Sequence, residues 1–310
     1  MTSPSNATLE SLGSPRIPTP ASSAPHPFYW SVRRELWENR SLYIAPLAVA
    51  ALILVGFLIS MVHLPEKMRA AMALSDHMQR QDIIEKHYNV AALLLMGTFL
   101  IVAVFYCLDA LYGERRDRSI LFWKSMPVSD LTVVLSKASV PLLLLPLLTW
   151  AITVVIQVIM LLLSTVALLT SGQSVAALWT HLPLIRMSVM LLYHLLFMHG
   201  LYYAPFYGWM LLVSAWARRA PLLWASLPLL AIGFVEKIAF NTSHFGAMLL
   251  ARFVGGPAAI DYPAQSSAMQ NMTPFTLAEF LLSPGLWIGL IVAAAFLAGA
   301  VRLRRYRDPI

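Results

Sequence analysis

Polar side chains are few in this sequence, and a set of them lies inside long apolar runs. Gln157 lies in one run, and His194, His199, Tyr202 and Tyr203 share another. Polar groups held inside apolar segments usually face protein or a cavity, so these five side chains are candidates for lining a substrate path. Ordinary packing with the polar end satisfied explains the histidines and tyrosines equally well. An interhelical hydrogen bond is the commoner use of Gln157.

Two further ionisable residues, Glu236 and Lys237, lie at the end of another apolar run. At ~1.5 Å per residue, Glu236 is about 20 Å along a helix from Leu222, near the boundary of an apolar layer. A carboxylate inside such a layer is a candidate functional site. At this depth, solvation or pairing with a basic residue such as Arg252 is the alternative.

The motifs that catalysis requires are absent from the sequence. Lys124-Ser125 lacks the glycine loop that cradles ATP phosphates, and no GxSxG, HExxH or GxGxxG pattern occurs. Cys107 is the single cysteine, which excludes an intrachain disulfide and a cysteine-based metal site. We therefore predict no catalytic residue, no metal and no cofactor in this chain, and expect it to be one component of a larger assembly.

The composition indicates where the chain resides. Of its 310 residues, 59% are hydrophobic and 12% are charged, and the mean hydropathy is +0.70. Soluble domains average about 25% charged residues. Half that share, combined with apolar runs of spanning length, predicts an all-α polytopic membrane protein. The net charge of +7 is explained by Lys and Arg on cytosolic loops rather than by a nucleic-acid partner.

Six apolar runs are near or above the ~20 residues that a ~30 Å hydrocarbon core requires. They are expected at 42–62, 90–108, 138–169, 187–216, 222–240 and 285–301. The third and fourth exceed the bilayer thickness. In the third, Pro141 and Pro146 predict either a kink or a first part that lies at the interface. The sixth carries Gly285 and Gly289, a GxxxG spacing that permits close helix contact.

The flanks of the spans predict the orientation. Residues 1–27 are rich in Ser and Pro and are expected to be disordered. Residues 28–40 are expected to form an amphipathic helix whose basic residues Arg33, Arg34 and Arg40 face anionic head groups; a simple basic flank is the alternative. The flank at 28–40, the 109–137 loop, the 217–220 turn and the 302–310 tail are basic, so both termini of the 41–301 membrane domain are expected in the cytosol. The membrane is expected to be a bacterial inner (plasma) membrane.

A cytosolic stretch, residues 109–137, connects the second and third spans. Its charges are Glu114, Arg115, Arg116, Asp117 and Arg118, and its apolar block is Ile120, Leu121, Phe122, Trp123 and Met126. Pro127 closes the block, and Ser129 and Asp130 are candidate N-caps of the next helix. A short amphipathic helix between two spans has little to bury against in water. We expect it to dock into a soluble partner; lying on the bilayer is the alternative.

This stretch resembles the permease subunits of type 2 ATP-binding-cassette (ABC) exporters. The matching positions are Glu114, Arg115, Ser119, Ile120, Leu121, Pro127, Val128, Ser129 and Lys137. The six-span order, the amphipathic first helix and the outside segment before the last span agree in layout. The family usually has Gly-Thr where this chain has Arg118-Ser119. The resemblance implies the G-type (type V) exporter fold, in which a permease pairs with a second copy or a paralogue, and each binds a cytosolic ABC ATPase that holds Mg-ATP.

By that resemblance, residues 114–126 are the coupling helix against the ATPase, and residues 28–40 are the connecting helix. The expected function is export of a substrate such as an amphiphilic lipid, drug or peptide. Two alternatives stay open. One is a membrane enzyme acting on lipids, in which His194, His199 or Glu236 would carry turnover without nucleotide. The other is a sensor or assembly partner of an ATPase.

Overall fold

The computed structural model describes residues 27–73, 76–125, 128–254 and 280–306. These residues are helical apart from short connections, and no strand occurs among them. Six helical segments in this part of the chain are long and apolar enough to cross a membrane, which confirms the all-α membrane class. The disorder expected at the amino terminus falls on residues outside the described part and stays a prediction.

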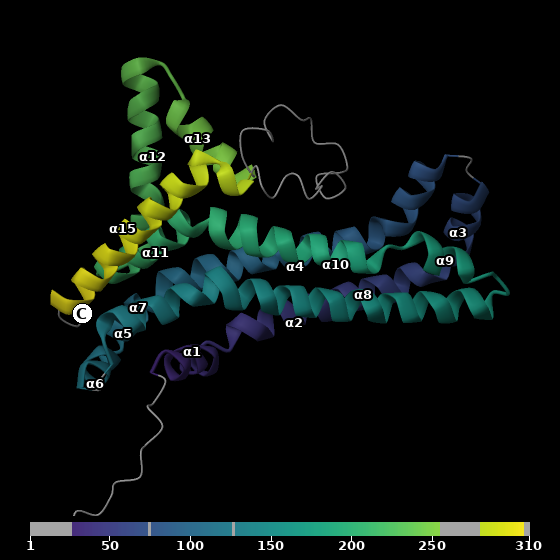
Figure 1. The fold of residues 1–310 in the computed structure, drawn as a ribbon, viewed down its shortest axis with the longest axis horizontal. Coiled ribbons are helices and arrows are strands. Elements are labelled where there is room, and N and C mark those ends of the chain that lie inside the picture. The colour runs from purple at the N-terminus through teal and green to yellow at the C-terminus, as the bar shows by residue number, and fades with distance from the viewer. Residues whose placement is uncertain (1–26, 74–75, 126–127, 255–279, 307–310) are drawn as a thin grey trace, which may run out of the picture.

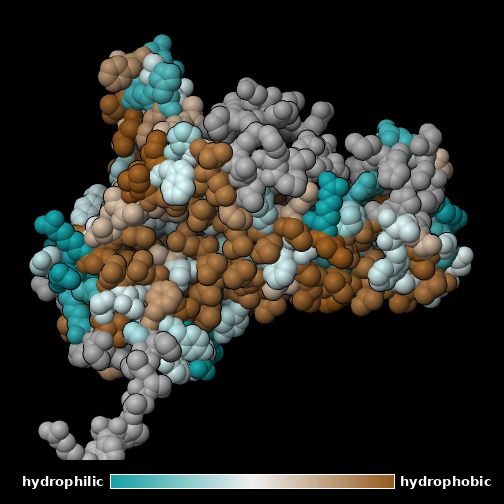
Figure 2. Space-filling view, in the orientation of Figure 1, coloured by the Kyte–Doolittle hydropathy of each residue, from teal (hydrophilic) through white to brown (hydrophobic). Residues whose placement is uncertain are grey.

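Four helices run side by side along the long axis of the molecule (Figure 1). They are α2 (Ser41–Ser60), α4 (His77–Ala110), α8 (Leu145–Thr170) and α10 (Leu184–Tyr193). Apolar residues cover the visible face of this bundle, and polar residues gather toward its ends (Figure 2). An apolar exterior is what a lipid environment requires, because helices satisfy their own backbone groups and lipid tails solvate apolar side chains.

The third and fourth apolar runs are longer than one straight span because each contains more than one helical segment. In the third, α7 (Asp130–Ser139) continues through a π-helix, η2 (Val140–Leu144), into α8 without a break. The prolines therefore do not end the helix; Pro141 falls in the wider π turn, where a backbone donor is dispensable. The fourth run passes from α10 through a second π-helix, η3 (His194–Tyr202), and then through a turn at Tyr203 into α11 (Ala204–Trp216).

Most charged elements gather at one end of the bundle, which we call the charged end. It holds α1 (Pro27–Glu38), α5 (Tyr112–Arg116), α6 (Ser119–Ser125), the start of α7 and the end of α15 (Pro284–Tyr306), as Figure 1 shows. Ser129 is the N-cap of α7, since its hydroxyl accepts the Thr132 backbone N–H at 3.1 Å. This confirms the predicted cap.

The opposite end carries short helices. They are η1 (Met61–His63), α3 (Leu64–Ala73) and α9 (Ala176–His181). The last of these lies between the third and fourth apolar runs.

The last part of the chain departs from the parallel arrangement. Helix α12 (Pro221–Phe240) rises across the long axis, and α13 (His244–Val254) folds back beside it (Figure 1). Helix α15 is longer than the predicted span and packs closely on α11: a Cβ on Gly208 would lie 3.2 Å from the Ala293 carbonyl oxygen.

Candidate functional site

The α5–α6 segment turns sharply between its two short helices. Arg118 makes the turn with φ at +57°, an uncommon conformation for a residue other than glycine. Beyond it, Ile120 is 1% exposed, whereas Leu121 and Phe122 are 56% and 61% exposed. One apolar side chain therefore holds α6 to the bundle and the next two face outward. Met126, Pro127 and the side chain of Trp123 lie outside what the structure describes.

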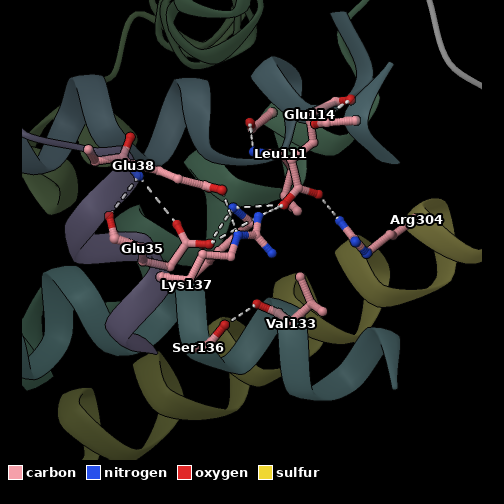
Figure 3. A network of polar contacts seen from close by, with 12 residues as sticks. Glu35, Glu38, Leu111, Glu114, Val133, Ser136, Lys137 and Arg304 are labelled. Carbon is pink, nitrogen blue, oxygen red and sulfur yellow. Dashed lines mark hydrogen bonds and ion pairs between the residues drawn. The ribbon is translucent and has the colours of Figure 1, made fainter. Parts of the chain in front are cut away.

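Glu114 is the centre of a buried ionic cluster (Figure 3). Its Oε1 atom lies 2.9 Å from a guanidinium nitrogen of Arg34 and 3.1 Å from Nζ of Lys137. Its Oε2 atom pairs with Arg304. These partners come from α1, α7 and α15, so one carboxylate joins the first helix, the start of the third span and the end of the last span.

A second carboxylate, Glu35, completes the cluster. It is 1% exposed and lies 2.8 Å from Nζ of Lys137, and the Tyr106 hydroxyl donates to it at 2.9 Å. Arg304 also pairs with Asp130 at 3.1 Å. Buried ions cost several kcal/mol each unless they are paired and hydrogen-bonded. We name Glu35, Glu114, Lys137 and Arg304 the ionic cluster; its two acids and two bases balance in charge.

Arg34 lies at the edge of the ionic cluster rather than toward head groups. It pairs with Glu38 at 2.9 Å in addition to Glu114. Desolvation by burial acts to lower the pKa of Arg34, but the hydrogen bond with Glu38 and the charges of Glu35 and Glu114 outweigh it and raise the pKa. The guanidinium is therefore charged at any physiological pH. Arg33, another basic residue predicted to face head groups, lies over the exposed Trp30 and Trp37 rings.

The predicted basic residues of the coupling helix separate into two groups. Arg115 is 3% exposed and donates to the backbone carbonyls of Ala215 and Ala217, at the end of α11. Arg116 and Arg118 are exposed. Inside this chain, Glu114, Arg115 and Ile120 therefore hold the segment in place, and Arg116, Arg118, Leu121 and Phe122 face outward.

The amino-acid sequence alone does not single out Glu35 or Arg304 as site residues, and Lys137 enters only through the family resemblance. Arg304 was assigned to a basic tail, yet α15 extends to Tyr306 and buries this side chain to 3% exposure. Helical spacing contained a signal for Glu35, since it lies between the apolar residues Val32 and Leu36 on α1. An acid on the apolar side of an amphipathic helix indicates a buried partner.

The polar residues of the predicted substrate path fall into two places. The Gln157 side chain donates to the Tyr88 carbonyl at 3.3 Å, which links α8 to α4. His199, in contrast, lies against Phe99 with ring centroids 5.7 Å apart. Tyr88 and Phe99 are ~16 Å apart along α4 at ~1.5 Å per residue. Gln157 thus makes an interhelical hydrogen bond away from the histidines.

The histidines and tyrosines form one aromatic cluster on η3. The rings of His194 and His199 are 4.9 Å apart, and Tyr203 is 5.2 Å from His199. Nδ1 of each histidine is buried without a hydrogen-bond partner. Tyr202, the last residue of η3, lies 6.5 Å from Tyr203, which forms the turn before α11. Wider helical turns of this kind often mark functional positions.

Glu236 has a structural role in this chain. Its carboxylate accepts the backbone N–H groups of His244 at 2.7 Å and Phe245 at 2.9 Å, as well as the Thr242 hydroxyl at 2.9 Å. It therefore caps the first turn of α13 from the end of α12. The pairing with Arg252 considered from the sequence is wrong, because Arg252 contacts Tyr202 instead. Lys237 is exposed.

Comparison with known proteins gives no relative from which a function can be transferred. No protein-family model matches the chain, and neither a curated protein nor a solved structure matches it. No group of three or more potential metal ligands occurs in the described part of the chain. Function is therefore argued from the ionic cluster, the exposed face of α6 and the aromatic cluster.

Proposed function

We propose that the chain is the permease subunit of an ABC exporter of the G-type (type V) class, whose ATP is hydrolysed by a separate cytosolic ATPase. The observation that carries this proposal is the α5–α6 segment. It presents Leu121 and Phe122 outward while Ile120 is packed inward and Glu114 is held by ion pairs. Exposed aromatic and aliphatic side chains on a fixed helix suit a protein interface.

The proposed mechanism uses the ionic cluster to transmit movement. Mg-ATP closes two ATPase subunits, one on each permease of a pair, and the closure displaces α6. Because Glu114 is bonded to Lys137 on α7 and to Arg304 on α15, movement of α5–α6 is passed to the third and sixth spans together. Tilting of these spans switches access between the two sides of the inner membrane, with the charged end in the cytosol.

Replacement of Phe122 by Ala tests the docking surface. The full chain is purified from its native membrane, where an ABC ATPase is expected to copurify. The variant should bind that ATPase roughly tenfold more weakly, since aromatic side chains contribute heavily to interfaces. Phe234→Ala is the matched control, because Phe234 is 69% exposed on α12, which is not one of the elements of the charged end.

Two outcomes would overturn the proposal. One is that no ABC ATPase copurifies with the wild-type chain. The other is that Phe122→Ala binds the ATPase as tightly as Phe234→Ala and instead loses affinity for lipid vesicles. The second result would make α6 a membrane anchor.

A membrane-embedded enzyme acting on lipids is the second candidate, favoured by the aromatic cluster on η3. Such an enzyme needs polar groups gathered at one depth, and the rings of His194 and His199 are 4.9 Å apart. For an enzyme, His194→Gln and His199→Gln should each abolish lipid turnover measured without nucleotide. For a permease, both variants should bind the ATPase normally, and no nucleotide-free turnover should be found in the wild type.

A further inference from the structure

Arg252 on α13 is a cation without an anionic partner. Its Nε donates to the Tyr202 carbonyl at 3.1 Å and its Nη1 to the Gly285 carbonyl at 3.3 Å. The guanidinium carbon lies 4.5 Å from the centroid of the Tyr202 ring. Nη2 is buried and has no hydrogen-bond partner, and no carboxylate of the described residues pairs with this side chain.

The hydrogen bonds of Arg252 place it where the end of η3 meets the start of α15. Tyr202 is the last residue of η3, and Gly285 is the second residue of α15. A charged side chain at the end of an apolar run needs water or an opposite charge. Two carbonyl groups supply hydrogen bonds but no opposite charge, so the described part of this site lacks a negative group.

Gly289 on the neighbouring helix α15 leaves room for the guanidinium of Arg252. A Cβ on Gly289 of α15 would collide with Nη2 of Arg252, whereas a Cβ on Gly285 would meet nothing within 4 Å. The GxxxG spacing thus accommodates Arg252 at Gly289, rather than serving as a helix–helix contact at both glycines. Only a residue without a side chain allows the guanidinium to lie flat against α15 here.

We propose that Arg252 and Tyr202 bind the phosphate group of an anionic amphiphile. Arg252 is partly exposed, and the planar fork of its guanidinium suits the oxygen atoms of a phosphate group. The ring of Phe280 lies 5.9 Å from Tyr202, and Phe197 lies 6.4 Å from Phe280, so apolar surface for an acyl chain adjoins the cation. The assignment of this amphiphile as cargo rests on the proposed function, but its binding does not.

The test measures lipid binding by the purified full chain, without ATPase. Protein in detergent is mixed with phosphatidylglycerol, with phosphatidylcholine or with inorganic phosphate, and bound molecules are counted by native mass spectrometry. We expect the wild type to prefer phosphatidylglycerol to phosphatidylcholine about tenfold, and Arg252→Gln to lose that preference. Arg252→Lys should retain only part of it, since it keeps the charge without the fork.

Gly289→Ala supplies a variant that keeps the arginine. The new methyl group pushes the flexible end of Arg252 off Tyr202, so it should lose the preference as Arg252→Gln does, while Gly285→Ala should behave as wild type. Equal lipid preference in the wild type and Arg252→Gln would overturn the site, and so would a loss in Gly285→Ala equal to that in Gly289→Ala. If the protein bound inorganic phosphate but not phosphatidylglycerol, an amphiphile would be excluded as the ligand. Failure here leaves the Phe122→Ala result unaffected, so the two proposals fail separately.

Discussion

Replacement of Glu114 by Gln is expected to lower the free energy of unfolding by about 3–5 kcal/mol, the range for removing one partner of a buried ion pair. Glutamine keeps the shape of the side chain but leaves Lys137 and Arg304 with less negative charge. Both cations are only 3% exposed at the side chain, so water cannot replace the carboxylate. Denaturant or thermal unfolding of the detergent-purified protein measures the loss.

A control and a rescue separate this effect from a general cost of mutation. Asp109→Asn also removes an acid near the end of α4, but Asp109 is 58% exposed and lies 3.8 Å from the exposed Arg116. It should cost less than about 1 kcal/mol. The double variant Glu114→Gln with Lys137→Met removes one charge of each sign, so it should be clearly more stable than the sum of its single changes predicts. Additive losses would contradict a coupled ionic cluster.

The spans were predictable because their cause is local. An apolar run of about 20 residues must form a helix in lipid, whatever its neighbours are, so the ends of α12 agree closely with the expected run 222–240. The π-helices were not predictable in this way. They depend on how η2 and η3 meet, which no single run of residues encodes. The orientation of α12 across the bundle has the same non-local origin.

The candidate site was predicted in location but not in the direction of its side chains. The sequence singled out residues 109–137, yet it assigned Glu114, Arg115 and Ile120 to a surface for a partner, and the structure buries all three in this chain. A charge on a connecting segment is expected to be solvated unless opposite charges reach it. Here they come from Lys137 and Arg304, which are distant in sequence, so only tertiary packing reveals the cluster.

Replacement of Gly200 by Ala is expected to cost about 3 kcal/mol, the upper part of the usual range for overpacking. Gly200 lies in η3 where this π-helix meets η2. A Cβ at this position would lie 2.7 Å from the Leu142 carbonyl oxygen and 3.5 Å from that of Leu195. Both are backbone atoms, so no flexible side chain can move aside, and the two π-helices would have to separate.

Gly97→Ala on α4 is the matched control, since a Cβ there would meet nothing within 4 Å. Alanine favours a helix over glycine by roughly 0.5–1 kcal/mol, so this variant should be as stable as the wild type or more so. The two substitutions are chemically identical and should change the free energy of unfolding in opposite directions. Gly200 also follows His199 directly, so separation of η2 and η3 would shift the aromatic cluster away from Phe99. A Gly200→Ala protein as stable as Gly97→Ala would show that the close approach of the π-helices does not hold the interior together.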